Sequence, residues 1–207
     1  MGNELTDKIN HISTRRIIGL TGGIATGKTT VANYLANVYD LPILDADIYA
    51  REAVSIGSPI LDAIAQRYGK EILLPDGNLN RSRLGEIIFS DPTERQWIDS
   101  IIHPDVRDRF LQAMAECATS TIVLVIPLLF EAQMTDLVTE IWVVMCSESQ
   151  QLQRLTERNQ LTPEQAKSRI NSQLSLAEKA ARADFVLDNS GNLSDLLKQV
   201  DFVIRNS

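Results

Sequence analysis

Cysteine and histidine are scarce in this chain of 207 residues, which contains two of each. Cys117 and Cys146 lie far apart in apolar surroundings, so we interpret both as reduced, buried thiols. With only His11 and His103 available, no metal cage of histidine and cysteine side chains can be drawn.

The chain also lacks an excess of basic residues. Its 20 lysines and arginines are outnumbered by 27 aspartates and glutamates, which gives a net charge of -7. Proteins that follow a nucleic-acid backbone usually carry clustered lysine and arginine. We therefore predict no nucleic-acid partner, and we expect any polyanion that binds to be small and held by a few local cations.

Long apolar segments are missing as well. The longest apolar run, 122–130, is too short to span a bilayer and is interrupted by Pro127. Residues 1–14 are polar, without the apolar stretch of a signal peptide. These features predict a cytoplasmic protein with no membrane partner, and we expect a monomer or a weak homo-oligomer.

Five short apolar segments have the pattern of buried strands, and helical patterns separate them. They are Arg15–Leu20, Leu41–Asp45, Thr121–Ile126, Glu140–Cys146 and Phe185–Leu187. This alternation predicts an α/β fold, with a parallel sheet covered by helices on both faces.

The connection between the second and third strands is much longer than the dozen or so residues that a crossover needs. It contains turn and cap signals at 57–59, 75–78, Asp91-Pro92 and His103-Pro104, so we predict a helical insertion at 49–119. We expect this insertion to bind substrate. The helical, arginine-rich segment 148–183 is poor in large apolar residues and is predicted to be a mobile lid. The nucleotide-binding core is then 15–48, 120–147 and 184–207.

The segment Gly22-Gly23-Ile24-Ala25-Thr26-Gly27-Lys28-Thr29 matches G-x-x-x-x-G-K-[ST], the P-loop motif, between a strand and a helix. Glycines let backbone N–H groups approach the phosphates of a nucleotide, and the helix N-terminus attracts their charge. Lys28 supplies a cation for the β and γ oxygens, and Thr29 supplies a hydroxyl for Mg²⁺. We therefore predict that residues Gly22 to Thr30 bind ATP and Mg²⁺. The predicted fold is the three-layer P-loop NTPase fold.

Two carboxylates, Asp45 and Asp47, follow the second strand at the sheet edge where ligands bind in open α/β folds. Either one could accept a hydroxyl proton or hold Mg²⁺. The alternative is that they cap the following helix.

Six further residues have weaker signals. Arg154 and Arg158 share one helix face and could cover a transferring phosphate, although solvated arginines have the same spacing. Asn189, in the turn after the fifth strand, could contribute to an adenine pocket. We interpret His103-Pro104 as a turn that starts a helix, and Glu131 as a solvated loop carboxylate.

Taken together, these motifs resemble the dephospho-coenzyme A kinase family. The resemblance runs from about Arg16 to Ile204. It rests on the P-loop opening IGLTGGIATGKTTVAN, then LDADIYAREAV, IHP at 102–104, VIPLLFE at 125–131 and FVLDNSG at 185–191.

The resemblance implies a reaction, its site residues and a fold. ATP would phosphorylate the ribose 3′-hydroxyl of dephospho-CoA, with Asp47 as the base and Arg154 as a lid arginine that binds phosphate. His103 would lie where the helical substrate lobe returns to the core, and Asn189 would lie against adenine. From the P-loop motif and the strand-end position, we predict that Thr29 and Asp45 are the metal ligands. The family's sheet has five parallel strands.

Ala25 and Thr26 depart from the Gly-Ser that is common in the family, and Thr29 replaces a serine. We expect Ala25 to fit if its φ is not positive. Two alternatives stay open: a kinase for another small hydroxyl compound, and a nucleotide-dependent regulator. In the first, Arg81, Arg83, Arg107 and Arg109 could form the acceptor site.

Overall fold

The computed structural model describes residues 15–206, so residues 1–14, for which the sequence predicts no role, and Ser207 lie outside it. The described chain packs as two units. One comprises the residues up to Leu44 and those from Met114 onward, and the other comprises Asp45–Ala113. None of the described helices is long and apolar enough to cross a membrane.

The first unit is built on the predicted sheet. Its strands are β1 (Arg16–Gly22), β2 (Ile43–Asp45), β3 (Thr121–Val125), β4 (Glu140–Met145) and β5 (Phe185–Asp188). Their order is β2-β3-β1-β4-β5, and β1 pairs in parallel with both β3 and β4. The predicted five-stranded parallel sheet is therefore confirmed, with strand bounds within a few residues of those predicted.

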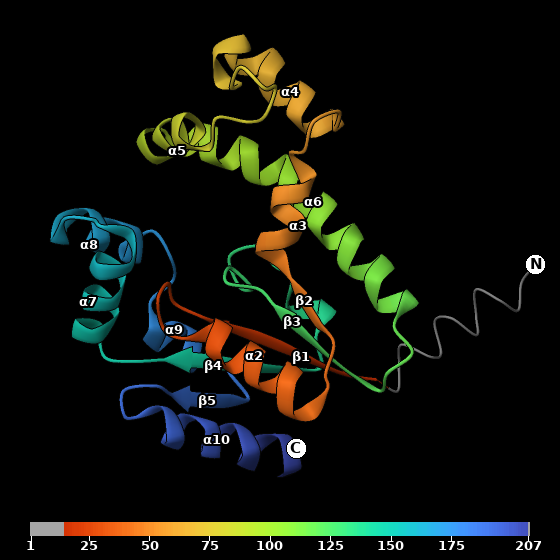
Figure 1. Ribbon diagram of the computed structural model, residues 1–207, viewed down its shortest axis with the longest axis vertical. Coiled ribbons are helices and arrows are strands. Elements are labelled where there is room, and N and C mark those ends of the chain that lie inside the picture. Colours follow the sequence, from red (N-terminus) through yellow and green to blue (C-terminus); the bar gives the residue numbers. More distant parts are fainter. Residues whose placement is uncertain (1–14, 207) are drawn as a thin grey trace, which may run out of the picture. The chain divides into compact units, whose positions relative to one another are not determined.

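Both faces of the sheet are buried, as the near-continuous apolar strands predict. Ile18 and Leu20 share a core with helices α2 (Lys28–Tyr39) and α10 (Leu193–Asn206) on one face (Figure 1). Successive side chains point to opposite faces of a strand, so Ile17 and Thr21 lie on the other face, where both are buried.

Three helices connect β4 to β5: α7 (Glu148–Asn159), α8 (Pro163–Asn171) and α9 (Leu176–Ala180). Each begins with a capping box, in which a serine or threonine side chain and a residue three positions later bond each other's backbone N–H groups. These polar caps define the starts of helices that have few apolar residues.

The second unit is helical, apart from one antiparallel bridge between Leu73 and Leu79 around the predicted turn at 75–78. Its elements are α3 (Ala46–Ala53), α4 (Pro59–Tyr68), the 3-10 helix η1 (Lys70–Ile72), α5 (Arg81–Ser90) and α6 (Pro92–Glu116), which runs beyond the unit boundary. Ile64 and Ile72 lie at the centre of a separate apolar core.

The prediction that His103-Pro104 starts a helix is wrong. Both residues lie inside α6, which begins at Pro92 and continues through Pro104. An internal proline removes a backbone hydrogen bond at a cost of about 3 kcal/mol. Buried side chains on both sides of it, Ile98 before and Phe110 after, offset this cost and keep the helix continuous.

Candidate active site

The P-loop connects β1 to α2 and ends at Gly27, the residue before the first turn of α2. Gly27 has a φ of 109°, and no side chain caps the N-terminus of the helix. The first N–H groups of a helix have no partner within it. The start of α2 therefore offers backbone donors to an anion.

Close packing also requires glycine at position 27. A Cβ atom there would overlap the Asn189 side-chain amide, and its φ would strain any other residue. Asn189 Nδ2 donates to the Thr26 carbonyl oxygen over 2.8 Å, so the loop after β5 is fastened to the P-loop. The structure thus brings Asn189 beside the P-loop motif.

Ala25 has a φ of 61°, so the condition under which an alanine fits this position without strain, a φ that is not positive, is not met. The loop must turn through the left-handed region between Ile24 and Thr26, and the chain places a Cβ atom there. Such a conformation costs a non-glycine residue about 1–2 kcal/mol. The loop tolerates this cost because its other contacts hold it in place.

Replacing Ala25 by glycine is expected to raise the free energy of unfolding by about 1 kcal/mol, because the strain is removed. Urea unfolding followed by circular dichroism measures the change. Ala36→Gly, in the interior of α2, is the opposite-sign control and should lower stability by about 1 kcal/mol. A loss of stability in Ala25→Gly would contradict the strain argument.

Lys28 extends back over the loop that precedes it. Its Nζ donates to the carbonyl oxygens of Gly23, at 2.7 Å, and Gly22, at 3.3 Å. The ammonium group therefore lies over the loop, where it can exchange these carbonyl oxygens for phosphate oxygens.

Arg154, on α7, donates from a terminal nitrogen to the Asn189 carbonyl oxygen over 3.1 Å. Asn189 contacts the P-loop in turn, so three predicted site elements form one connected group. Arg158 does not share this position, because it is exposed and donates to the neighbouring Asn159. The two arginines of this helix therefore have different surroundings.

Cys146 directly follows β4, lies next to this group and is buried. Burial raises the pKa of its thiol, and the nearby Arg154 guanidinium opposes that shift only in part. The group is thus a neutral thiol at neutral pH, and the prediction of a free, buried cysteine is confirmed for Cys146. Cys117 is also a free thiol but is only partly buried, so the prediction that it is buried is wrong.

Glu131 is not the solvated carboxylate that the sequence suggests. Its Oε1 accepts from the Leu174 N–H at 3.0 Å and pairs with Lys179 Nζ at 2.9 Å. The Lys179 side chain is fully buried and also donates to the Pro127 carbonyl oxygen. The pair fastens α9 to the segment after β3. Its partner lies far along the chain, so sequence spacing gave no signal for it.

Glu131→Gln should lower the free energy of unfolding by about 3 kcal/mol, because Lys179 is left as an unpaired buried charge. Urea titration tests this, with Glu157→Gln on the exposed side of α7 as a control. A double change, Glu131→Leu with Lys179→Met, should recover much of the loss. Equal urea midpoints of unfolding for the wild type and Glu131→Gln would refute the stabilising role of the Glu131–Lys179 pair.

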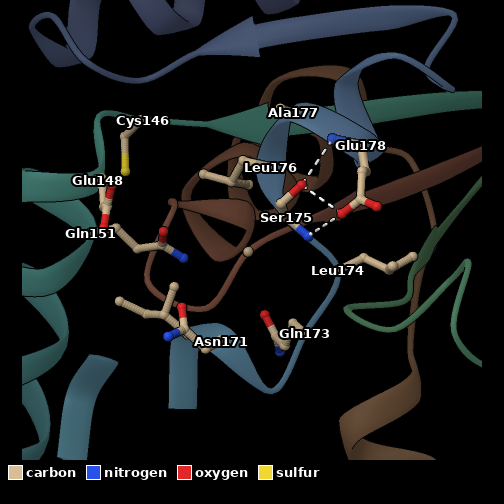
Figure 2. Close-up of a pocket in the computed structure, with 12 residues that line it drawn as sticks. Cys146, Glu148, Gln151, Asn171, Gln173, Leu174, Ser175, Leu176, Ala177 and Glu178 are labelled. Atoms are coloured by element: carbon tan, nitrogen blue, oxygen red, sulfur yellow. Dashed lines mark hydrogen bonds between the residues drawn. The ribbon is translucent and has the colours of Figure 1, made fainter. Parts of the chain in front are cut away.

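Two glutamines that sequence reasoning left without a role contact the P-loop directly. Gln151 Nε2 donates to the Ile24 carbonyl oxygen at 2.8 Å, and Gln173 Oε1 accepts from the Ile24 N–H at 3.0 Å. Both line a cavity of about 510 Å³ between the P-loop and the α7–α9 segment (Figure 2). The amide side chains carry no charge pattern that would mark them in sequence.

Asp45, Asp47 and His103 belong to the second unit, and each is described within that unit. Asp45 caps α3, because its Oδ1 accepts from the Asp47 N–H at 2.8 Å. His103 lies partly exposed on α6, with Nε2 3.7 Å from Asp99 Oδ1. The capping alternative thus holds for Asp45, while the catalytic role of Asp47 and the substrate role of His103 stay predictions.

Comparison with known proteins decides the family. The family model described as dephospho-CoA kinase matches residues 16–195. The chain belongs to the dephospho-CoA kinase family. The dephospho-CoA kinase of Trichormus variabilis is 75% identical over 191 residues, covering 92% of this chain and 97% of that protein. The dephospho-CoA kinase of a Synechocystis species is 58% identical, and the match covers 90% of this chain and 93% of that protein.

Solved structures agree with this family assignment. The dephospho-CoA kinase of Campylobacter jejuni superposes with a TM-score of 0.67 at 26% identity, covering 91% of this chain and 95% of that one. TT1252 from Thermus thermophilus superposes with a TM-score of 0.78 at 30% identity, and the match covers 92% of this chain and 97% of that one. A shikimate kinase from Bacteroides thetaiotaomicron has the same fold as this chain, with a TM-score of 0.54 at 13% identity.

Proposed function

We propose that this chain transfers the γ-phosphate of ATP to the ribose 3′-hydroxyl of dephospho-CoA, giving coenzyme A and ADP. The observation that carries the proposal is the uncapped start of α2 behind a glycine-containing loop, with the Lys28 ammonium over that loop. Family membership supplies the acceptor.

The residues of the first unit would bind and orient ATP. Backbone N–H groups of the P-loop and Lys28 would hold the β- and γ-phosphates and stabilise the charge that grows on the ADP oxygen. Arg154 would neutralise the transferring phosphoryl group, and Asn189 would lie against the adenine. Their connection through the Asn189 carbonyl oxygen supports a common site.

The second unit would bind the acceptor, with His103 as a contact, and Asp47 would take the proton of the 3′-hydroxyl. The hydroxyl oxygen forms a bond to the γ-phosphorus while the bond to the ADP oxygen breaks. The support for Asp47 is its position two residues after β2, because ligands bind at the carboxyl edge of such sheets.

Mg²⁺ suits the oxygen donors of this site, since it binds through one or two protein oxygens together with substrate phosphates. Thr29, exposed in the first turn of α2, would hold it through its hydroxyl. Asp45 already uses one carboxylate oxygen as a cap, so it would contribute the other. When bound, the ion neutralises charge on the phosphates.

An assay of ADP release with a panel of acceptors tests the function. Dephospho-CoA should be turned over far faster than AMP, shikimate or water. Preference for another hydroxyl compound would favour the alternative kinase. Slow hydrolysis that no acceptor accelerates would favour a nucleotide-dependent regulator. Either result would overturn the proposal.

A further inference from the structure

Ile24 stands in the middle of the P-loop, and both of its backbone polar groups are bonded to glutamine side chains from the α7–α9 segment. Gln151 lies in the first turn of α7, and Gln173 lies in the connection between α8 and α9. Gln151 donates to the Ile24 carbonyl oxygen, and Gln173 accepts from the Ile24 N–H group. Two separate parts of the segment therefore hold one residue of the loop.

This arrangement is packed as well as bonded. The Gln151 side chain is 3% exposed, although it is polar. A Cβ atom at Gly23 would come within 2.5 Å of Gln151 Nε2 and 3.1 Å of Leu176. A side chain at the second position of the motif would therefore displace the Gln151 amide from its place against the loop.

Gln173 is itself held in place from the far side. The next residue, Leu174, donates its N–H to Glu131, which pairs with the buried Lys179. The connection between α8 and α9 is thus fastened to the core one residue after Gln173. A bonded path runs from the buried ion pair through Leu174 and Gln173 to Ile24.

We propose that Gln151 and Gln173 are positioning residues that hold the P-loop in its phosphate-binding conformation through Ile24. Neither side chain needs to contact the substrate, because the backbone of Ile24 carries their effect to the residues that follow. Those residues include the strained Ala25 and the uncapped start of α2. Without the glutamines, ATP must order the loop itself, and its affinity falls.

The inference rests on the proposed function only for its kinetic part. Hydrogen exchange of the amides of 22–30 and the dissociation constant for ATP are measured without any acceptor. If the wild type binds ATP but does not phosphorylate dephospho-CoA, the proposed function fails while the test of the glutamines still stands.

Gln151→Ala and Gln173→Ala should each raise amide exchange in 22–30 and the Kd for ATP by roughly 10-fold, since each removes one hydrogen bond to the loop. The KM for dephospho-CoA should not change. Both amides act on one residue, so the double variant should lose far less than the product of the two single effects.

Gln173→Glu is the rescue variant, because its carboxylate still accepts from the Ile24 N–H and should keep exchange of the nucleotide-free loop near the wild-type rate. Gln153→Ala, on the exposed side of α7, is the matched control. Unchanged exchange and ATP affinity in both alanine variants would overturn the proposal. A lower Tm with no change in amide exchange in 22–30 would also overturn it. So would a double variant whose effect equals the product of the two single effects.

Discussion

Asp47→Asn is expected to lower kcat for dephospho-CoA phosphorylation by roughly 100-fold or more, the usual scale for the loss of a positioned general base. The amide cannot accept the hydroxyl proton, yet it has the size of the carboxylate and suits the first turn of α3. The Kd for ATP should stay close to that of the wild type. Steady-state ADP release and equilibrium nucleotide binding measure the two quantities.

Asp62→Asn is the matched control, because Asp62 also lies in the first turn of a helix of the second unit and is exposed. Asp45→Asn separates the two roles of the neighbouring carboxylate, since asparagine caps a helix as well as aspartate does. A rise in the Mg²⁺ concentration needed for half-maximal turnover in that variant would assign its charge to the metal. Full turnover in Asp47→Asn would show that Asp47 is only a helix residue.

Lys28→Ala should raise the Kd for ATP and lower kcat/KM by roughly 100- to 1,000-fold, the scale for removing one donor aimed at developing charge. Its charge acts on the phosphates both in the bound substrate and in the transition state, so both quantities change. Isothermal titration with ATP and the ADP-release assay provide the two measurements.

Lys198→Ala is the control, because Lys198 is an exposed lysine of α10 that pairs with the exposed Asp195. The fold should survive in Lys28→Ala, since the hydrogen bonds from Lys28 Nζ to Gly22 and Gly23 lie within the P-loop segment itself. Wild-type affinity and turnover in Lys28→Ala would end the P-loop interpretation of this site.

The sheet and the P-loop could be predicted from sequence because their signals are local. Each buried strand is a short apolar run, and the motif between β1 and α2 follows from what phosphates require of a backbone. Even Gly27, Asn189 and Arg154 were named individually. Their mutual contacts could not be predicted, since Asn189 and Thr26 are 163 residues apart in sequence and Arg154 and Asn189 are 35 residues apart.

The errors had a common physical origin. His103-Pro104 has a local helix-start signal, but packing on both sides of Pro104 decided the outcome. The sequence predicts a solvated Glu131 because its partner Lys179 is distant in sequence. Ala25 adopts a positive φ that its residue type disfavours, and the contacts around the loop impose it. Where tertiary contacts outweigh local conformational preference, the conformation cannot be predicted from a single sequence.

The most direct test of the central claim is to follow both products when ATP meets dephospho-CoA or its 3′-deoxy analogue. The account predicts one ADP and one coenzyme A per transfer with the natural acceptor, with the new phosphate on the 3′ oxygen by ³¹P NMR. It predicts no acceptor-stimulated ADP release with the analogue. Equal ADP release with both compounds, or a phosphate at any other position, would contradict it.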